Sequence, residues 1–167
     1  MIAHLVCAIS LVVFYILQTT IVAQTPLLAG YSDLILLFIA AWSLQPKAKN
    51  KWFWTLVAGV LISLVSAMPF FTPLIGYFGV LLFSVLLQNQ VWRVPLITMI
   101  IVTFVGTIFQ QAVYVISLQV SGAPIAWRES IDMVILPSIL LNLIFAIPIF
   151  AIASELARRV YPLEEEL

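Results

Sequence analysis

The sequence predicts an all-α integral membrane protein, in which residues 1–167 form a single transmembrane domain of six helices with both termini in the cytoplasm. Hydrophobic residues make up 64% of the chain and charged residues only 8%, whereas soluble domains have roughly a quarter charged residues. So little charge does not cover the surface of a soluble fold of this length. Long apolar runs, separated by short polar or proline-containing breaks, indicate helices that span a bilayer.

The first two expected spans differ in length. The first covers residues 3–22 and the second only residues 34–44, with Pro26 between them and Pro46 after the second. Because a full crossing needs about 20 residues, the second span is long enough only if residues 26–32 also lie partly within the membrane. Non-helical backbone is tolerated there only where protein or water satisfies its hydrogen bonds. A five-span alternative makes the second segment re-entrant.

Four further spans follow from runs that lack charge. No charged residue occurs from Trp52 to Trp92, and Pro69 and Pro73 divide this run of 41 residues into two. The expected spans cover residues 53–67, 74–87, 95–118 and 133–157. The charged segment from Trp127 to Asp132 is expected to be a separate short segment at the membrane surface.

Basic residues predict the orientation. Six spans put six of the seven Lys and Arg residues on the side of the N-terminus and leave Arg128 on the other side. Because basic loops remain cytoplasmic, both termini are expected in the cytoplasm. The five-span alternative is disfavoured because it separates Lys47–Lys51 from Arg158 and Arg159. The N-terminal run has no basic region before it and is too long for a cleaved signal peptide, so we expect a retained first span.

Asp33 is the first candidate functional residue. It is the only acidic residue among the first 128, and nine apolar residues follow it directly. Ionisable residues within or beside a span are costly and often mark function. Two interpretations remain open: Asp33 caps the next helix at the membrane surface, or it caps the helix and also makes a specific polar contact.

Neutral polar and small residues supply the other candidates. Polar side chains in spans form interhelical hydrogen bonds, and small residues let helices approach closely. We interpret them mainly as residues that hold the bundle together, and alternatively as the lining of a groove for a partner helix or a small ligand. Near the last span, two charged candidates either lie in solvent or contact the extracytoplasmic part of a partner. The neutral candidates are Gln18, Gly59, Ser63, Gly76 and Asn142, and the charged ones are Arg128 and Asp132.

Several classes of function are disfavoured. The chain has no nucleophile motif, zinc-protease motif or phosphate-binding loop, so we expect no enzyme activity and no cofactor. A single cysteine excludes an intramolecular disulfide, and the single histidine, His4, has no Asp or Glu close in sequence, so no metal site is expected. A net charge of zero gives no electrostatic footprint for nucleic acid.

Four segments resemble the bacterial rod shape-determining protein family MreD. They are Leu-Gln-Thr-Thr at 17–20, Tyr-Ser-Asp-Leu-Ile-Leu-Leu at 31–37, the glycine- and proline-containing block at 59–78, and the Pro-to-Asn segment at 136–142. Two positions depart from the family pattern. Ser32 stands where the family usually has proline, and Ser63 stands near a position where the family often has an acid.

The resemblance implies a non-enzymatic scaffold subunit of the cell-elongation machinery in the bacterial inner membrane. Such a subunit would bind a single-span MreC-like protein and, indirectly, an MreB-like filament and a peptidoglycan glycosyltransferase and transpeptidase. The family fold is similar to that of the substrate-binding subunits of energy-coupling-factor vitamin transporters. The alternative function is therefore a small-molecule-binding subunit of such a transporter, with a pocket near Asp33, Trp127, Arg128 and Asp132.

Overall fold

The computed structural model describes residues 2–90, 94–123 and 126–161, and within these ranges it is helical without a β-strand. Three helical stretches are long and apolar enough to cross a membrane, namely Ala3–Gln24, Pro95–Val120 and Trp127–Val160. Three shorter apolar helices accompany them, namely Leu34–Leu44, Lys51–Val65 and Phe71–Leu87. The predicted all-helical fold is confirmed for the described residues, and the length and composition of these helices are compatible with a membrane protein.

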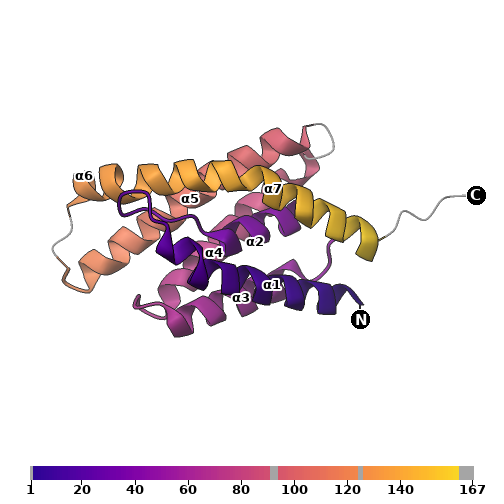
Figure 1. Cartoon of the computed structure of the whole chain (residues 1–167), viewed down its shortest axis with the longest axis horizontal. Coiled ribbons are helices and arrows are strands. Elements are labelled where there is room, and N and C mark those ends of the chain that lie inside the picture. The colour runs from indigo at the N-terminus through magenta and orange to yellow at the C-terminus, as the bar shows by residue number, and fades with distance from the viewer. Residues whose placement is uncertain (1, 91–93, 124–125, 162–167) are drawn as a thin grey trace, which may run out of the picture.

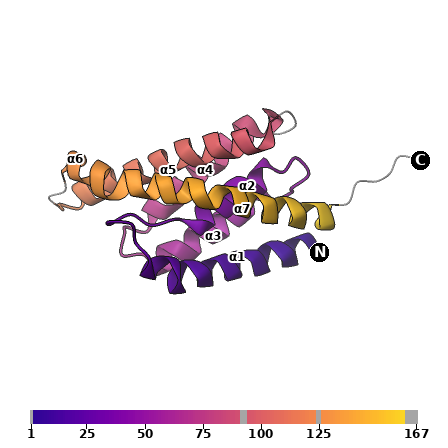
Figure 2. The ribbon, with the colours of Figure 1, turned by 45° about the horizontal axis from the view of Figure 1, so that its top comes forward.

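The helices run roughly along one direction (Figures 1 and 2). The N-terminus and the end of the last helix lie at the same end of the bundle (Figure 1). In chain order the elements are α1 (Ile2–Thr20), the 3₁₀ turn η1 (Val22–Gln24), α2 (Leu34–Leu44), α3 (Lys51–Val65), α4 (Phe71–Leu87), the 3₁₀ turn η2 (Gln88–Gln90), α5 (Pro95–Val120), α6 (Trp127–Ser130), the π-helical turn η3 (Ile131–Ile135) and α7 (Leu136–Val160).

Helix α2 forms the centre of the bundle. All eleven of its residues are buried, and it contacts α1, α3, α4, α5 and α7. A helix that is hydrophobic on every side is stable only when other helices surround it, and α2 has no charged residue between Leu34 and Leu44. Its bounds are those expected for the second span.

The charged segment before the last helix differs from its prediction. Trp127 to Asp132 is not a separate surface segment, because it forms the first turns of one continuous helix that extends to Val160. Pro137 is accommodated by the π-helical turn, in which the Leu136 N–H donates to the carbonyl of Ile131. Proline cannot donate to the carbonyl four residues earlier, which is that of Met133, and the N–H of Ala29 donates to it instead at 3.0 Å.

The segment from Thr25 to Asp33 runs into the bundle along this helix. Its N–H groups meet successively deeper acceptors, from the Met133 carbonyl for Ala29 to the Asn142 side chain for Asp33. These acceptors are nine residues apart, which is about 13 Å at 1.5 Å per residue. Helix α2 therefore begins well inside the bundle, and Asp33 does not lie at its end.

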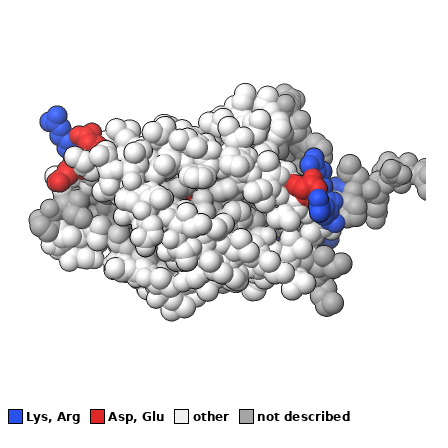
Figure 3. Space-filling view, in the orientation of Figure 1, with Lys and Arg blue, Asp and Glu red and all other residues white. Residues whose placement is uncertain are grey.

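Charged side chains gather at the two ends of the molecule, and in this view the described surface between them shows only a small acidic area in a central hollow (Figure 3). At one end, Lys49 N–H donates to Tyr161 Oη at 3.3 Å and Asn50 pairs with His4 at 3.1 Å. Arg128, Glu129 and Asp132 belong to the opposite end, where α6 lies. A largely uncharged band between charged ends is the surface expected of a protein in a bilayer.

Replacement of Gly30 by alanine tests the close packing of this segment on α7. A Cβ atom at Gly30 would lie 2.7 Å from the Val134 carbonyl oxygen and 2.8 Å from Ser138 N, and backbone cannot move aside as a side chain can. We expect Gly30→Ala to reduce the free energy of unfolding by about 1–3 kcal/mol, measured by SDS titration in mixed micelles. The neighbouring control, exposed Ala29→Ser, should change it by less than about 0.5 kcal/mol. Equal stability of the two variants would mean that the segment does not pack against α7.

Candidate functional site

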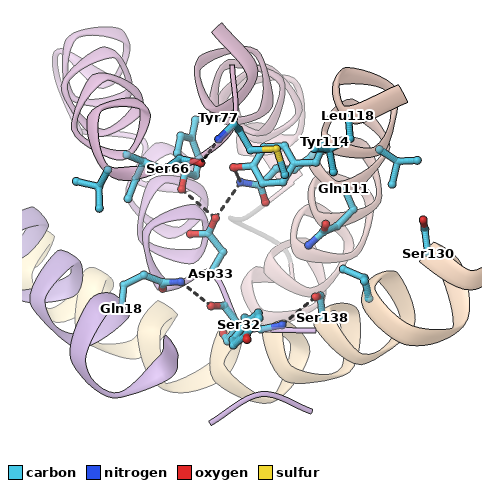
Figure 4. A pocket seen from close by; sticks show the side chains of 17 residues that line it. Gln18, Ser32, Asp33, Ser66, Tyr77, Gln111, Tyr114, Leu118, Ser130 and Ser138 are labelled. Carbon is cyan, nitrogen blue, oxygen red and sulfur yellow. Dashed lines mark hydrogen bonds between the residues drawn. The ribbon is translucent and has the colours of Figure 1, made fainter. Parts of the chain in front are cut away.

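Asp33 joins three helices through its carboxylate. As the N-cap of α2 it accepts from Leu36 N–H at Oδ1, at 2.8 Å. Its Oδ2 accepts from Tyr77 Oη of α4 at 2.9 Å and from Gln110 Nε2 of α5 at 2.8 Å (Figure 4). The interpretation as a cap with a specific polar contact is therefore correct.

Asn142 of α7 binds the residues just before α2. Its Oδ1 accepts from Ser32 Oγ at 2.9 Å and from Asp33 N–H at 2.7 Å. Its Nδ2 donates to Thr107 Oγ1 of α5 at 2.9 Å. Because the side chain is only 1% exposed, water does not replace these bonds, and Asn142 links α7, α5 and the start of α2.

Gln18 of α1 makes a paired contact with the same backbone. Its Nε2 donates to the Ser32 carbonyl at 2.9 Å, and its Oε1 accepts from Leu34 N–H at 2.8 Å. The first N–H groups of a helix have no partner within the helix. Here Gln18, Asp33 and Asn142 provide acceptors for them from side chains.

A cavity of about 400 Å³ lies beside this cluster, on the side where α2 has no helical turns. Asp33, Tyr77 and Gln110 form its polar wall, and the ends of α3, α5 and α7 form most of the remainder (Figure 4). The lining residues are Gln18, Tyr31, Ser32, Asp33, Ile62, Val65, Ser66, Met68, Tyr77, Gln110, Gln111, Tyr114, Val115, Leu118, Ser130, Val134 and Ser138. The short length of α2 thus creates a space in which a carboxylate faces an otherwise mainly apolar wall.

The structure brings together three of the predicted candidates, Gln18, Asp33 and Asn142, whereas the charged pair lies apart. Arg128 and Asp132 are exposed, do not line the cavity, and form no ion pair among the described residues. Trp127 is not a lining residue either. The expected pocket near Asp33 therefore does not include these three residues.

The small candidates pack helices within the chain. A Cβ atom at Gly59 would lie 2.6 Å from Leu74 Cδ2, and one at Gly76 would lie 2.9 Å from Gln110 Cγ. Ser63 Oγ lies 2.7 Å from the carbonyl oxygens of both Gly59 and Phe70. Gly76 therefore positions Gln110 close to Asp33, whereas Gly59 and Ser63 serve the contact of α3 with α4.

Three residues of the site, Tyr77, Thr107 and Tyr114, were not among the predicted candidates, and Gln110 was considered only as one of the neutral polar residues within the spans. Thr107, Gln110 and Tyr114 lie on one face of α5 at a spacing of three and four residues, which brings side chains to the same side of a helix. This spacing was available in the sequence. Tyr77 had no comparable signal beyond its place after Gly76.

Comparison of the chain with protein-family models, with curated proteins and with solved structures finds no match.

Replacement of Asn142 by leucine tests the cluster. Leucine has a similar volume but would leave the buried Asp33 N–H and the Ser32 and Thr107 hydroxyls without their present partner. Each buried unsatisfied group costs about 1–3 kcal/mol, so we expect Asn142→Leu to reduce the free energy of unfolding in micelles by more than about 2 kcal/mol. Leu140→Ala, at a position 52% exposed on the same helix, is the control with a small effect. Unchanged stability of Asn142→Leu would contradict the role of these hydrogen bonds in stabilising the fold.

Proposed function

We propose that this chain is a non-enzymatic scaffold subunit of the bacterial cell-elongation machinery, similar to the MreD family. It would bind the membrane helix of a single-span MreC-like partner in the inner membrane. Through that partner it would support regulated peptidoglycan synthesis by a glycosyltransferase and transpeptidase linked to an MreB-like filament.

One observation carries the proposal, namely the convergence of the segments on which the resemblance rests. Gln18 comes from the segment at 17–20, Asp33 from that at 31–37 and Asn142 from that at 136–142, and all three bind at the start of α2. Residues separated by about 110 positions thus form one hydrogen-bonded unit. Such convergence supports a shared structural role for these short motifs, each of which alone is weak evidence for the resemblance.

In this proposal, the six main helices each cross the bilayer, and the segment from Thr25 to Asp33 completes the crossing of α2. Both termini are cytoplasmic. Support comes from the basic residues, because Lys49 is bonded to Tyr161 near the C-terminal end of α7 and Lys51 begins α3 beside it. Arg128 belongs to the opposite end, and basic residues favour the cytoplasmic side.

One of the two interpretations of the small residues of α3 and α4 was that they line a groove for a partner helix. Since Gly59 and Gly76 already contact Leu74 and Gln110, the partner would bind another surface. The described chain offers exposed apolar side chains on several helices, among them Leu5, Val12 and Ile16 of α1.

Co-purification tests the proposal. The tagged chain is expressed with an MreC-like protein, either intact or with its membrane helix replaced by an unrelated apolar helix of equal length. We expect near-equal recovery with the intact partner and loss of the complex with the replaced helix, as measured by quantitative mass spectrometry. Equal recovery of both partners would contradict binding through the membrane helix.

The cavity favours a second candidate function, the small-molecule-binding subunit of an energy-coupling-factor vitamin transporter. Its support is a space of about 400 Å³ with convergent polar groups, which is within the range of ligand sites. Recovery of the chain from native membranes with a pair of ATPases and a second membrane subunit would favour this candidate over the scaffold.

A further inference from the structure

The carboxylate of Asp33 has no cationic partner among the described residues. Its contacts come from a backbone N–H, a tyrosine hydroxyl and a glutamine amide, all of which are neutral. Among the described residues, no lysine, arginine or histidine lines the cavity beside it. Asp33 is half-buried beside this cavity, and a carboxylate against a mainly apolar wall is costly unless a positive charge or a proton balances it.

The walls of the cavity suit an organic cation. Three tyrosines, Tyr31, Tyr77 and Tyr114, line the same space as Asp33, and aromatic rings attract ammonium groups through their electron-rich faces. Gln111 also lines the cavity, and its side chain makes no hydrogen bond within the described part of the chain. It is thus available as a further polar contact (Figure 4).

A single metal ion would not fill the cavity, and the rest of the lining does not suit one. A volume of about 400 Å³ far exceeds the roughly 30 Å³ of one water molecule, and hence the volume of a single metal ion. Ile62, Val65, Val115, Leu118 and Val134 provide apolar wall. The described residues also contain no group of three His, Cys, Asp or Glu side chains suited to a metal. The volume and the apolar lining therefore suit an apolar body attached to the charge.

We propose that this cavity binds a small organic ammonium ion, with its nitrogen at the Asp33 carboxylate and its apolar part against the ends of α3 and α5 and Val134 of η3. The site goes beyond the scaffold proposal, because it requires neither a partner protein nor transport. Its occupation would strengthen the junction of α1, α2, α4, α5 and α7, because the ion would bind the residue on which these helices converge.

The test uses three probes of similar shape on the purified full chain in detergent micelles at pH 7. They are 2-phenylethylamine, which is cationic, 2-phenylethanol, which is neutral, and 3-phenylpropionate, which is anionic. We expect the amine alone to raise the melting temperature in a saturable manner, because a ligand that binds only the folded state stabilises it. The alcohol and the acid control for partition into the micelle.

Variants locate the binding. Asp33→Asn keeps an N-cap residue but removes the charge, and should weaken binding of the amine by at least about tenfold, or 1.4 kcal/mol. Asp33→Ser, which also caps, is the second variant if the first does not fold. Asp132→Asn removes an acid from the exposed end of the chain and should leave binding unchanged.

A saturable effect of the amine that both Asp33 variants lose establishes the site. The proposal is overturned if the amine has no saturable effect, if the alcohol acts equally, or if an Asp33 variant binds as the native chain does. An equal loss in Asp132→Asn would also overturn it, because general surface charge would then explain the binding. Since no partner is present, this result is independent of the co-purification with an MreC-like protein.

Discussion

The structure depends on hydrogen bonding of the irregular backbone that precedes α2. Within a bilayer, N–H and C=O groups outside a helix require partners from the protein, and here side chains of α1 and α7 provide several of them. Gln18 and Asn142 bind the backbone from Ser32 to Leu34, and the carbonyl of Met133, released by Pro137, accepts from Ala29. The segment before α2 therefore uses the hydrogen-bond acceptor that Pro137 leaves free in the last helix.

The same arrangement produces the candidate site. Because α2 begins inside the bundle, its N-cap carboxylate lies beside the space that further helical turns would have filled. Tyr77 and Gln110 fix the orientation of Asp33, and Gly76 allows Gln110 to approach. A short central helix thus serves two purposes: it permits dense packing of its apolar residues, and it leaves a polar cavity at its start. A scaffold or a binding subunit could use this combination.

Local features of the sequence were sufficient to predict the helices and the cap. The bounds of α2 follow from Asp33 before an apolar run and Pro46 shortly after it. Contacts between distant segments were not predictable in this way, since no periodicity connects Gln18 with Asn142. The last helix begins at Trp127, six residues before the expected span of 133–157. Helical turns tolerate charged residues at an exposed end, and the π-helical turn before Pro137 lets the helix continue.

A double-mutant cycle between Asp33 and Tyr77 tests the central claim most directly, namely that one carboxylate couples α2 to the surrounding helices. The free energy of unfolding is measured in micelles for Asp33→Ala, Tyr77→Phe and the double variant. Residues that share a hydrogen bond show coupling of about 0.5–3 kcal/mol, and the 2.9 Å contact predicts a favourable coupling of at least about 1 kcal/mol. Additive effects, with coupling below about 0.3 kcal/mol, would contradict the account.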